Sequence, residues 1–239
     1  MPDKSRWSLA QEYEKKWWDK RSNNIDFEFY KIFANELKEY LDDSLNITET
    51  TKILEIGSGA GGILTYLTES DNRYAVDPLE DFYSSVPEFV NQRDESVQYF
   101  KAMGEELPFE NDFFDLIIVD NVLDHCDDPP KVMLEAKRVL KPGAVIYFKQ
   151  NTYHLWGTTV RFLMEKLLID KGHPHTFTKN NLRKLIDSAD FDIVKKNRGG
   201  YLKTWKKEFA STTLKDKIKA VLFVTRDKVT YLLKLESNN

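Results

Sequence analysis

Residues 53–63 read ILEIGSGAGGI, and residues 74–78 read YAVDP. The first segment joins an apolar, strand-like run to a loop of closely spaced glycines, where the backbone can adopt positive φ or touch a ligand. Asp77 follows Gly57 by 20 residues, at the expected end of a second strand. A carboxylate in that position can accept hydrogen bonds from both hydroxyls of a ribose. Together the two segments predict a site for a nucleoside-containing cofactor.

The glycines alone do not distinguish one such cofactor from another. Gly57, Gly59 and Gly62 also satisfy the G-x-G-x-x-G pattern of dinucleotide-binding proteins, so an NAD-dependent oxidoreductase is an alternative. Glu55 disfavours a dinucleotide, because a carboxylate beside the turn would repel a pyrophosphate and attract an ammonium group.

Residues 104–147 add further motifs in the stretch GEELPFENDFFDLIIVDNVLDHCDDPPKVMLEAKRVLKPGAVIY. It contains E-E-L-P-F, F-D, V-L-x-H and R-V-L-K-P-G in this order, after the E-x-G-x-G-x-G of residues 55–61. From residue 52 to residue 148 the chain resembles the class I S-adenosylmethionine-dependent methyltransferases, in particular the methyltransferase type 11-like group. The resemblance implies S-adenosyl-L-methionine as the cofactor and leaves the methyl acceptor open.

After residue 52, short apolar runs alternate with helical stretches, which is typical of a doubly wound parallel sheet. We expect strands at residues 52–56, 73–76, 97–101, 114–120 and 144–149, and helices at residues 60–69, 87–92, 129–140 and 179–189. The resemblance implies an α/β, Rossmann-like sheet of seven strands in the order 3-2-1-4-5-7-6, with the last strand antiparallel. Residues 191–195 and 228–235 would complete it.

Two segments lie outside this alternating pattern. Residues 1–46 are expected to form an N-terminal helical lid of one or two amphipathic helices, with a break at residues 21–24. Residues 47–239 would be the cofactor-binding domain, with a helical insertion at about residues 153–172 after the fifth strand.

The resemblance assigns cofactor contacts by position. The glycine loop would pack against the methionine moiety, Glu55 would face its ammonium group, and Asp77 would hold the ribose hydroxyls. Met103 departs from the family pattern, in which an aspartate commonly accepts from the adenine amino group; a thioether can only pack on the ring. The residues expected to bind the cofactor are Glu55, Gly57, Ser58, Gly59, Gly61, Asp77, Pro78, Met103, Gly104, Glu105, Asp120 and Asn121.

All four histidines follow the fourth or fifth strand, on the side where an acceptor must lie. An imidazole can accept a proton near neutral pH, so His125, His173 and His175 are candidate catalytic bases. A packing role beside the cofactor is the alternative for His125. The acceptor pocket is expected between the N-terminal helix and the insertion, with Tyr13, Trp17, Tyr153 and His154 as substrate-binding residues.

We expect no metal in the site. Asp120 matches the first acid of the magnesium site in catechol-type methyltransferases, but Gln150 and Asn151 stand where a second acid is required. The histidines do not have the Cys/His spacing of a zinc site either.

Composition limits the possible partners. The chain has 239 residues, a net charge of −4 and one cysteine, Cys126. The net charge disfavours nucleic acid, and the single cysteine suits a reducing compartment. The first residues lack the apolar core of a signal peptide and no apolar run suggests a membrane span, so we expect a cytoplasmic protein. Nine Lys and Arg residues lie between residues 195 and 219, either as a solvated face or as a patch for a phosphorylated substrate or an anionic surface.

The sequence therefore predicts a methyltransferase of a small polar metabolite, with O-methylation of a sugar or sugar-phosphate derivative favoured. A phosphorylated or nucleotide-linked acceptor is one form of this prediction. N-methylation of an amino sugar or another amine is the closest alternative. A non-catalytic S-adenosylmethionine-binding partner module is an alternative of another class. The sequence does not determine the oligomeric state.

Overall fold

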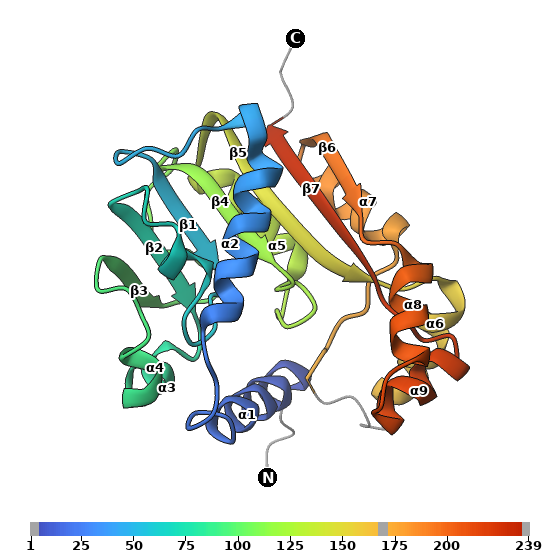
Figure 1. Ribbon diagram of the computed structural model, residues 1–239. Coiled ribbons are helices and arrows are strands. Elements are labelled where there is room, and N and C mark those ends of the chain that lie inside the picture. Colours follow the sequence, from blue (N-terminus) through green and yellow to red (C-terminus); the bar gives the residue numbers. More distant parts are fainter. Residues whose placement is uncertain (1–4, 167–171, 236–239) are drawn as a thin grey trace.

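The fold is built on a seven-stranded sheet in the order β3-β2-β1-β4-β5-β7-β6. The computed structural model describes residues 5–166 and 172–235 (Figure 1). Strand β7 is antiparallel to both β5 and β6, whereas the other pairs are parallel. The predicted fold class, strand order and antiparallel strand are thus confirmed. The strands are β1 (Lys52–Ile56), β2 (Asn72–Asp77), β3 (Val97–Lys101), β4 (Phe114–Asp120), β5 (Leu140–Thr152), β6 (Phe191–Arg198) and β7 (Asp227–Leu235).

Helices cover both faces of the sheet. Helix α2 lies across one face, α5 lies behind the other, and α1 lies beyond the carboxyl ends of the strands (Figure 1). The predicted break between the first two helices is confirmed as a turn before Ile25. The helices are α1 (Arg6–Asp19), α2 (Glu28–Leu41), α3 (Glu80–Ser84), α4 (Pro87–Val90), α5 (Pro129–Val139), α6 (Leu155–Lys166), α7 (Lys179–Ser188), α8 (Tyr201–Phe209) and α9 (Leu214–Val221), with 3₁₀ turns η1 (Asp42–Ser44) and η2 (Ile63–Tyr66).

The central strands are apolar on both sides because both faces are covered. Along β4, Leu116 and Ile118 pack with the α2 side of the core, whereas Ile117 and Val119 pack with the α5 side. All four side chains are fully buried. Successive side chains of a strand point to opposite faces, so an unbroken apolar run is what a sheet between two helical layers requires.

The predicted helix at residues 60–69 is wrong. Only the short turn η2 forms there, because Gly62 has φ 78°, which no right-handed helix allows. The buried carboxylate of Glu55 accepts hydrogen bonds from the amides of Ile63 at 3.0 Å and Leu64 at 3.1 Å. A tertiary hydrogen-bond partner thus replaces the helical one.

Helices α8 and α9, between β6 and β7, were not predicted. Their exposed faces carry apolar residues, so they lack the usual pattern of a helix that packs its apolar side on a core. The insertion after β5 is helical, as expected, over α6; its predicted remainder at residues 167–171 lies outside the described residues. Within the described residues, no helix has the length and apolar character needed to cross a bilayer.

Substitution of Gly61 tests how the N-terminal helices pack on the glycine loop. A Cβ atom on Gly61 would lie 2.5 Å from ring atoms of Phe27, which is fully buried and packs against Phe89. We expect Gly61→Ala to lower the free energy of unfolding by about 1–3 kcal/mol, because the ring has no space to move. Urea denaturation would measure the change.

Gly157→Ala is the matched control, since its added methyl group would meet Tyr153 at an ordinary 3.5 Å. Equal stability of Gly61→Ala and the parent protein would show that Phe27 does not fix this contact.

Candidate functional site

A cavity of about 560 Å³ opens at the carboxyl ends of the parallel strands, beside α1. Ligands of open parallel sheets bind at this edge. The cavity has the volume of an ordinary small-molecule site. Residues expected at the site that line it are Glu55, Gly57, Ser58, Gly59, Asp77, Pro78, Met103, Gly104, Glu105, Asp120, Asn121, His125, His173, Tyr13 and Trp17.

The glycine loop is tied to the end of β2. The amides of Gly57 and Ser58 both donate to the carbonyl of Val76, at 2.8 and 3.3 Å. Gly57 and Gly59 have φ values of 72° and 60°, a conformation that side chains disfavour. A Cβ atom on Gly59 would lie 3.1 Å from the ring of Trp18. The loop therefore exposes its backbone to the cavity and leaves no room for a side chain at Gly57 or Gly59.

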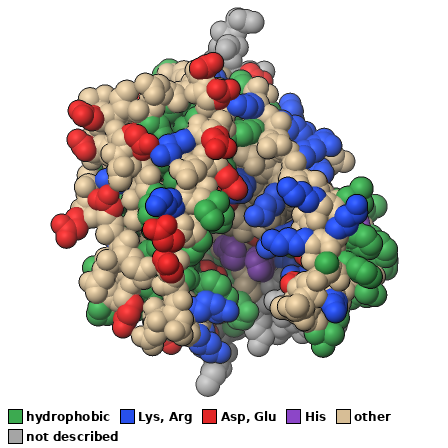
Figure 2. Space-filling view, viewed as in Figure 1, with side chains coloured by type: hydrophobic (Ala, Val, Ile, Leu, Met, Phe, Trp, Pro, Cys, Tyr) green, Lys and Arg blue, Asp and Glu red, His purple; other side chains and the backbone are tan. Residues whose placement is uncertain are grey.

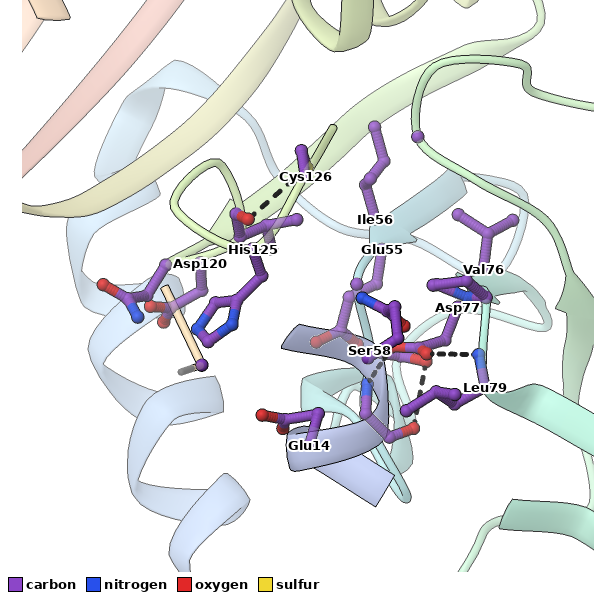
Figure 3. Close-up of a pocket in the computed structure, with 18 of the residues that line it drawn as sticks. Glu14, Glu55, Ile56, Ser58, Val76, Asp77, Leu79, Asp120, His125 and Cys126 are labelled. Carbon is purple, nitrogen blue, oxygen red and sulfur yellow. Dashed lines mark hydrogen bonds between the residues drawn. The ribbon is translucent and has the colours of Figure 1, made fainter. Parts of the chain in front are cut away.

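Asp77 joins this loop to the segment after β2. Its Oδ2 accepts from the amide of Gly59 at 3.0 Å and its Oδ1 from the amide of Leu79 at 2.9 Å (Figure 3). Burial raises the pKa of Asp77 to about 6. Each carboxylate oxygen can accept more than one hydrogen bond, so the group can still receive two hydroxyl donors from the cavity.

Glu55 lies deeper, between the glycine loop and η2. Its carboxylate already accepts the two amides that end the glycine loop, and it also borders the cavity. Burial, together with the nearby charges of Asp120 and Asp77, raises the pKa of Glu55 to about 8. A cation in the cavity would favour the ionised carboxylate.

The loop after β4 is fixed against the end of β5. Asn121 has φ 58°, its amide donates to the carbonyl of Lys149 at 2.7 Å, and its Oδ1 accepts from the amide of Asn151 at 3.1 Å. Asparagine tolerates this left-handed conformation better than most residues. The loop directs the ring of His125 into the cavity, on the side opposite Asp77 (Figure 3).

His125, His173 and Asp124 form a cluster at the cavity wall. The two imidazole rings have centroids 4.6 Å apart, and His173 Nε2 lies 4.0 Å from Asp124 Oδ2. Gln150 Nε2 donates to Asp124 Oδ1 at 2.8 Å and so orients the buried carboxylate. This arrangement places an oriented acid beside two potential bases.

The same cluster is the one grouping within the described residues whose donor atoms could hold a metal ion. Those atoms lie within 4.8 Å of one another. Zinc binds nitrogen and oxygen ligands at about 2.0–2.2 Å. The donor atoms of the three side chains would therefore have to move closer together to bind an ion.

Four residues expected at the site lie outside the cavity lining. Gly61 faces Phe27 in the core. His175 Nε2 lies 3.2 Å from the carbonyl of Asp127, in a separate shallow pocket beside α5. His154 Nε2 lies 2.7 Å from the carbonyl of Phe223, and the Tyr153 ring lies under the guanidinium of Arg161.

Glu105 holds the start of α5, because its Oε1 accepts from the amides of Asp127 at 2.8 Å and Asp128 at 3.0 Å. Gly104 allows close packing there, since a Cβ atom would lie 2.9 Å from Ile56. Met103 borders the cavity beside them.

Three cations at the other end of the cavity were missed by the sequence analysis. Lys149 Nζ lies 3.2 Å from both Asp120 Oδ2 and Glu36 Oε2. Arg226 and Lys228, at the start of β7, also line the cavity and form no ion pair within the described part of the chain. Burial, with Lys149 and Arg226 nearby, lowers the pKa of Lys228. The only signal in the sequence was a lysine at the end of the apolar fifth strand.

Tyr30 of the second N-terminal helix was also missed. Trp18 and Tyr30 line the cavity beside the glycine loop; Trp18 donates to Glu14 Oε1 at 2.9 Å, and the Tyr30 hydroxyl donates to the carbonyl of Ser58 at 3.3 Å. The sequence analysis had instead selected Tyr13 and Trp17 of the first helix as substrate-binding residues.

Known proteins share both the sequence motifs and this architecture. The model of the methyltransferase domain family matches residues 54–148. The chain is 31% identical to an uncharacterized protein of Methanocaldococcus jannaschii, over 57% of the chain and 56% of that protein. It is 29% identical to sarcosine/dimethylglycine N-methyltransferase of Aphanothece halophytica, over 53% of the chain and 47% of that protein.

A solved structure shows the same fold with a cofactor product. Phosphoethanolamine N-methyltransferase 2 of Haemonchus contortus, in complex with phosphomonomethylethanolamine and S-adenosylhomocysteine, superposes with a TM-score of 0.62 at 13% identity. The match covers 85% of the chain and 53% of that protein. Residues 54–148 match the methyltransferase domain family, and the chain resembles the class I S-adenosylmethionine-dependent methyltransferases in sequence motifs and fold. Its cofactor is S-adenosylmethionine.

The residues of this methyltransferase fit that cofactor. The exposed glycine backbone, the acid at the end of β2 and the cavity volume meet the needs of an amino acid joined to a nucleoside. The chain spans about half the length of the first two curated relatives.

Asp77→Ala is expected to weaken S-adenosylhomocysteine binding by about 1.5–3 kcal/mol, because a charge-assisted hydrogen bond to the ribose and the support of Gly59 are both lost. Calorimetry would measure it. Asp81→Ala, which removes an exposed acid of α3 paired with Lys101, should bind normally. Equal affinities of the two variants would contradict the role given to Asp77.

Cofactor binding should release a proton near neutral pH. Glu55 is mostly protonated at pH 7 because its pKa is about 8 without ligand, and the cofactor ammonium favours the ionised form. The complex then binds fewer protons than the free protein, so affinity should rise with pH up to about 8, by at most about tenfold per pH unit.

Calorimetry at pH 7 in two buffers of different ionisation enthalpy measures the released proton. Glu55→Gln should abolish the release, whereas the Asp81→Ala control should keep it. Proton uptake, or no exchange at all, would exclude a Glu55–ammonium contact.

Proposed function

We propose that the protein transfers a methyl group from S-adenosylmethionine to a hydroxyl of a small polar metabolite, most favourably a sugar or sugar-phosphate derivative. The observation that supports this best is the cluster of Asp124, His125 and His173, in which both histidines line the cofactor cavity and the buried Asp124 lies next to His173. A hydroxyl must lose its proton during the reaction, and an imidazole within reach can accept it.

The bound cofactor supplies a methyl carbon on a sulfonium, and the carbon–sulfur bond breaks as the acceptor oxygen attacks. The chain supplies position and proton transfer. His125 projects into the cavity and takes the hydroxyl proton, while His173 and Asp124 stabilise the resulting imidazolium. Gln150 keeps Asp124 in place, so the base is oriented before the acceptor binds.

The cations at the far end of the cavity indicate that the acceptor has an anionic group. Lys228 lies on β7, next to β5, and pairs in register with Asn151, and Arg226 directly precedes β7. Figure 2 shows histidine side chains in a hollow with Lys and Arg side chains along its β7 side. A phosphate held there would orient a phosphorylated or nucleotide-linked acceptor with its hydroxyl toward the histidines.

The N-terminal helix α1 would serve as the lid over this reaction. It places Tyr13, Trp17 and Trp18 along the cavity, and Arg6 of the same helix donates to the carbonyl of His173 at 3.4 Å. Aromatic faces favour a sulfonium and exclude water from it. A cytoplasmic location remains a prediction from the single cysteine.

N-methylation of an amino sugar or another amine is the second candidate. The relative from Aphanothece halophytica is named for two methylated amines, and the carboxylate of Glu14 in the cavity lining suits an ammonium. A non-catalytic module is disfavoured, because the glycine loop and Asp77 are intact.

A panel of acceptors tests the reaction. Sugar phosphates, nucleotide sugars, neutral sugars and amines are incubated with S-adenosylmethionine, and products are detected by mass spectrometry. We expect a methyl ether of a phosphorylated compound and little product from neutral sugars. With that acceptor, His125→Ala should keep cofactor affinity and lose turnover by about 10²–10⁴-fold.

His154→Ala is the matched control, because His154 bonds the carbonyl of Phe223 outside the cavity. Turnover should also persist in excess EDTA; its loss there would assign the cluster to a metal. Normal turnover of His125→Ala and His173→Ala would favour the amine acceptor.

A further inference from the structure

Helices α6, α8 and α9 expose an unusual amount of apolar side-chain surface. Leu155 of α6 is 81% exposed, Leu202 of α8 is 68% exposed, and Leu214 and Val221 of α9 are 73% and 64% exposed. We name this face, with Trp156 and Phe209, the apolar surface. The three helices carry most of the large apolar side chains that are exposed in the described part of the chain.

The three helices form one continuous unit. Trp156 of α6 donates to the carbonyl of Leu222 at 3.0 Å, directly after α9. Trp205 of α8 donates to the carbonyl of Ala220 at 2.9 Å and stacks on Phe223 with an interplanar angle of 7°. The three helices therefore lie together as one unit beside the sheet (Figure 1).

The helical period shows that the exposure is systematic. Leu214, Ile218 and Val221 follow one another at i, i+4 and i+7 along α9 and are all exposed, while Ala220 on the inner side is buried. Surface helices of a water-soluble domain ordinarily turn such a stripe inward. In α8 the inward position is instead occupied by Glu208, which accepts from the hydroxyl of Thr225 at 2.6 Å.

Positive charge flanks the apolar surface. Lys203, Lys206 and Lys207 belong to α8, and Lys217 and Lys219 belong to α9. The two acids of these helices are already bonded: Glu208 to Thr225, and Asp216 to Lys219 and Thr213. The face is thus basic on a chain whose net charge is −4. Figure 2 shows hydrophobic side chains gathered on this side, with Lys and Arg side chains around them.

We propose that α6, α8 and α9 dock the protein on an anionic membrane surface. The apolar side chains enter the boundary between headgroups and acyl chains, and the lysines bind lipid phosphates. Apolar side chains and basic charge on the same face are what interfacial helices use to bind anionic bilayers without crossing them.

A second copy of the chain fits this face less well. Two copies would bring lysine-rich surfaces together, and lysine is depleted from protein interfaces whereas it favours anionic headgroups. The proposal does not depend on the acceptor or on the reaction, because none of its residues lines the cofactor cavity.

Vesicle co-sedimentation of the full chain tests the proposal. We expect binding to vesicles of two parts phosphatidylcholine to one part phosphatidylglycerol, and much weaker binding to phosphatidylcholine alone. Leu214→Glu with Val221→Glu should lower the partition coefficient by at least about tenfold, since both side chains would otherwise be buried in the bilayer. Lys206→Gln with Lys217→Gln should lower it about fivefold per lysine and reduce its salt dependence.

Leu134→Glu is the matched control, because Leu134 is an exposed leucine of α5, away from the three helices. All variants should keep the parent affinity for S-adenosylhomocysteine, which shows that they are folded. The proposal is overturned if the parent chain binds neither vesicle, or if the glutamate pair leaves binding unchanged. It is equally overturned if the parent chain is a dimer in solution that the glutamate pair dissociates, since the apolar surface would then be a protein interface.

Discussion

The attachment of the glycine loop to the end of β2 determines the rest of the site. Two loop amides share the carbonyl of Val76, and the amide of Gly59 binds Asp77. These bonds join β1 to β2 at the edge where ligands of parallel sheets lie, and they leave the loop backbone facing the cavity. The acid that would hold the ribose is therefore the same group that holds the loop, so binding and local architecture cannot be separated at this residue.

Glu55 imposes the matching constraint from the other side of the loop. A buried carboxylate is costly unless it is hydrogen-bonded, and the amides of Ile63 and Leu64 satisfy it. Those amides are thereby removed from a helix, which explains why only a 3₁₀ turn follows the glycines. The raised pKa of Glu55 shows that two amides do not fully compensate burial. A cationic ligand group would offset the remaining free-energy cost of burying the Glu55 carboxylate.

The sequence predicted those parts of the molecule that depend on local pattern or on family motifs. The apolar strand runs predicted the alternating α/β pattern, the glycine spacing and Asp77 predicted the cofactor edge, and the family resemblance implied the sheet order. The helix at residues 60–69 was mispredicted because Glu55 acts from the preceding strand. The cations Arg226 and Lys228 reach the cavity only through the pairing of β7 with β5, a long-range contact that no local pattern reveals. His154 and His175 were grouped with the other histidines by position, but each binds a backbone carbonyl away from the cavity.

The two unusual features of the C-terminal third lie next to each other along the chain. Helix α9 ends at Val221. Two cations of the cavity follow it, Arg226 just before β7 and Lys228 within β7. The same segment thus contributes to the apolar surface on the outside and supplies positive charge to the cavity.

A family domain spanning residues 54–148 requires neither feature, because the cofactor edge is complete without them. Features added outside the common domain are where acceptor choice resides in folds of this kind, since binding residues concentrate on connections while the sheet remains constant. The start of β7, where Arg226 and Lys228 reach the cavity, is consequently the part of this chain in which acceptor specificity should be sought.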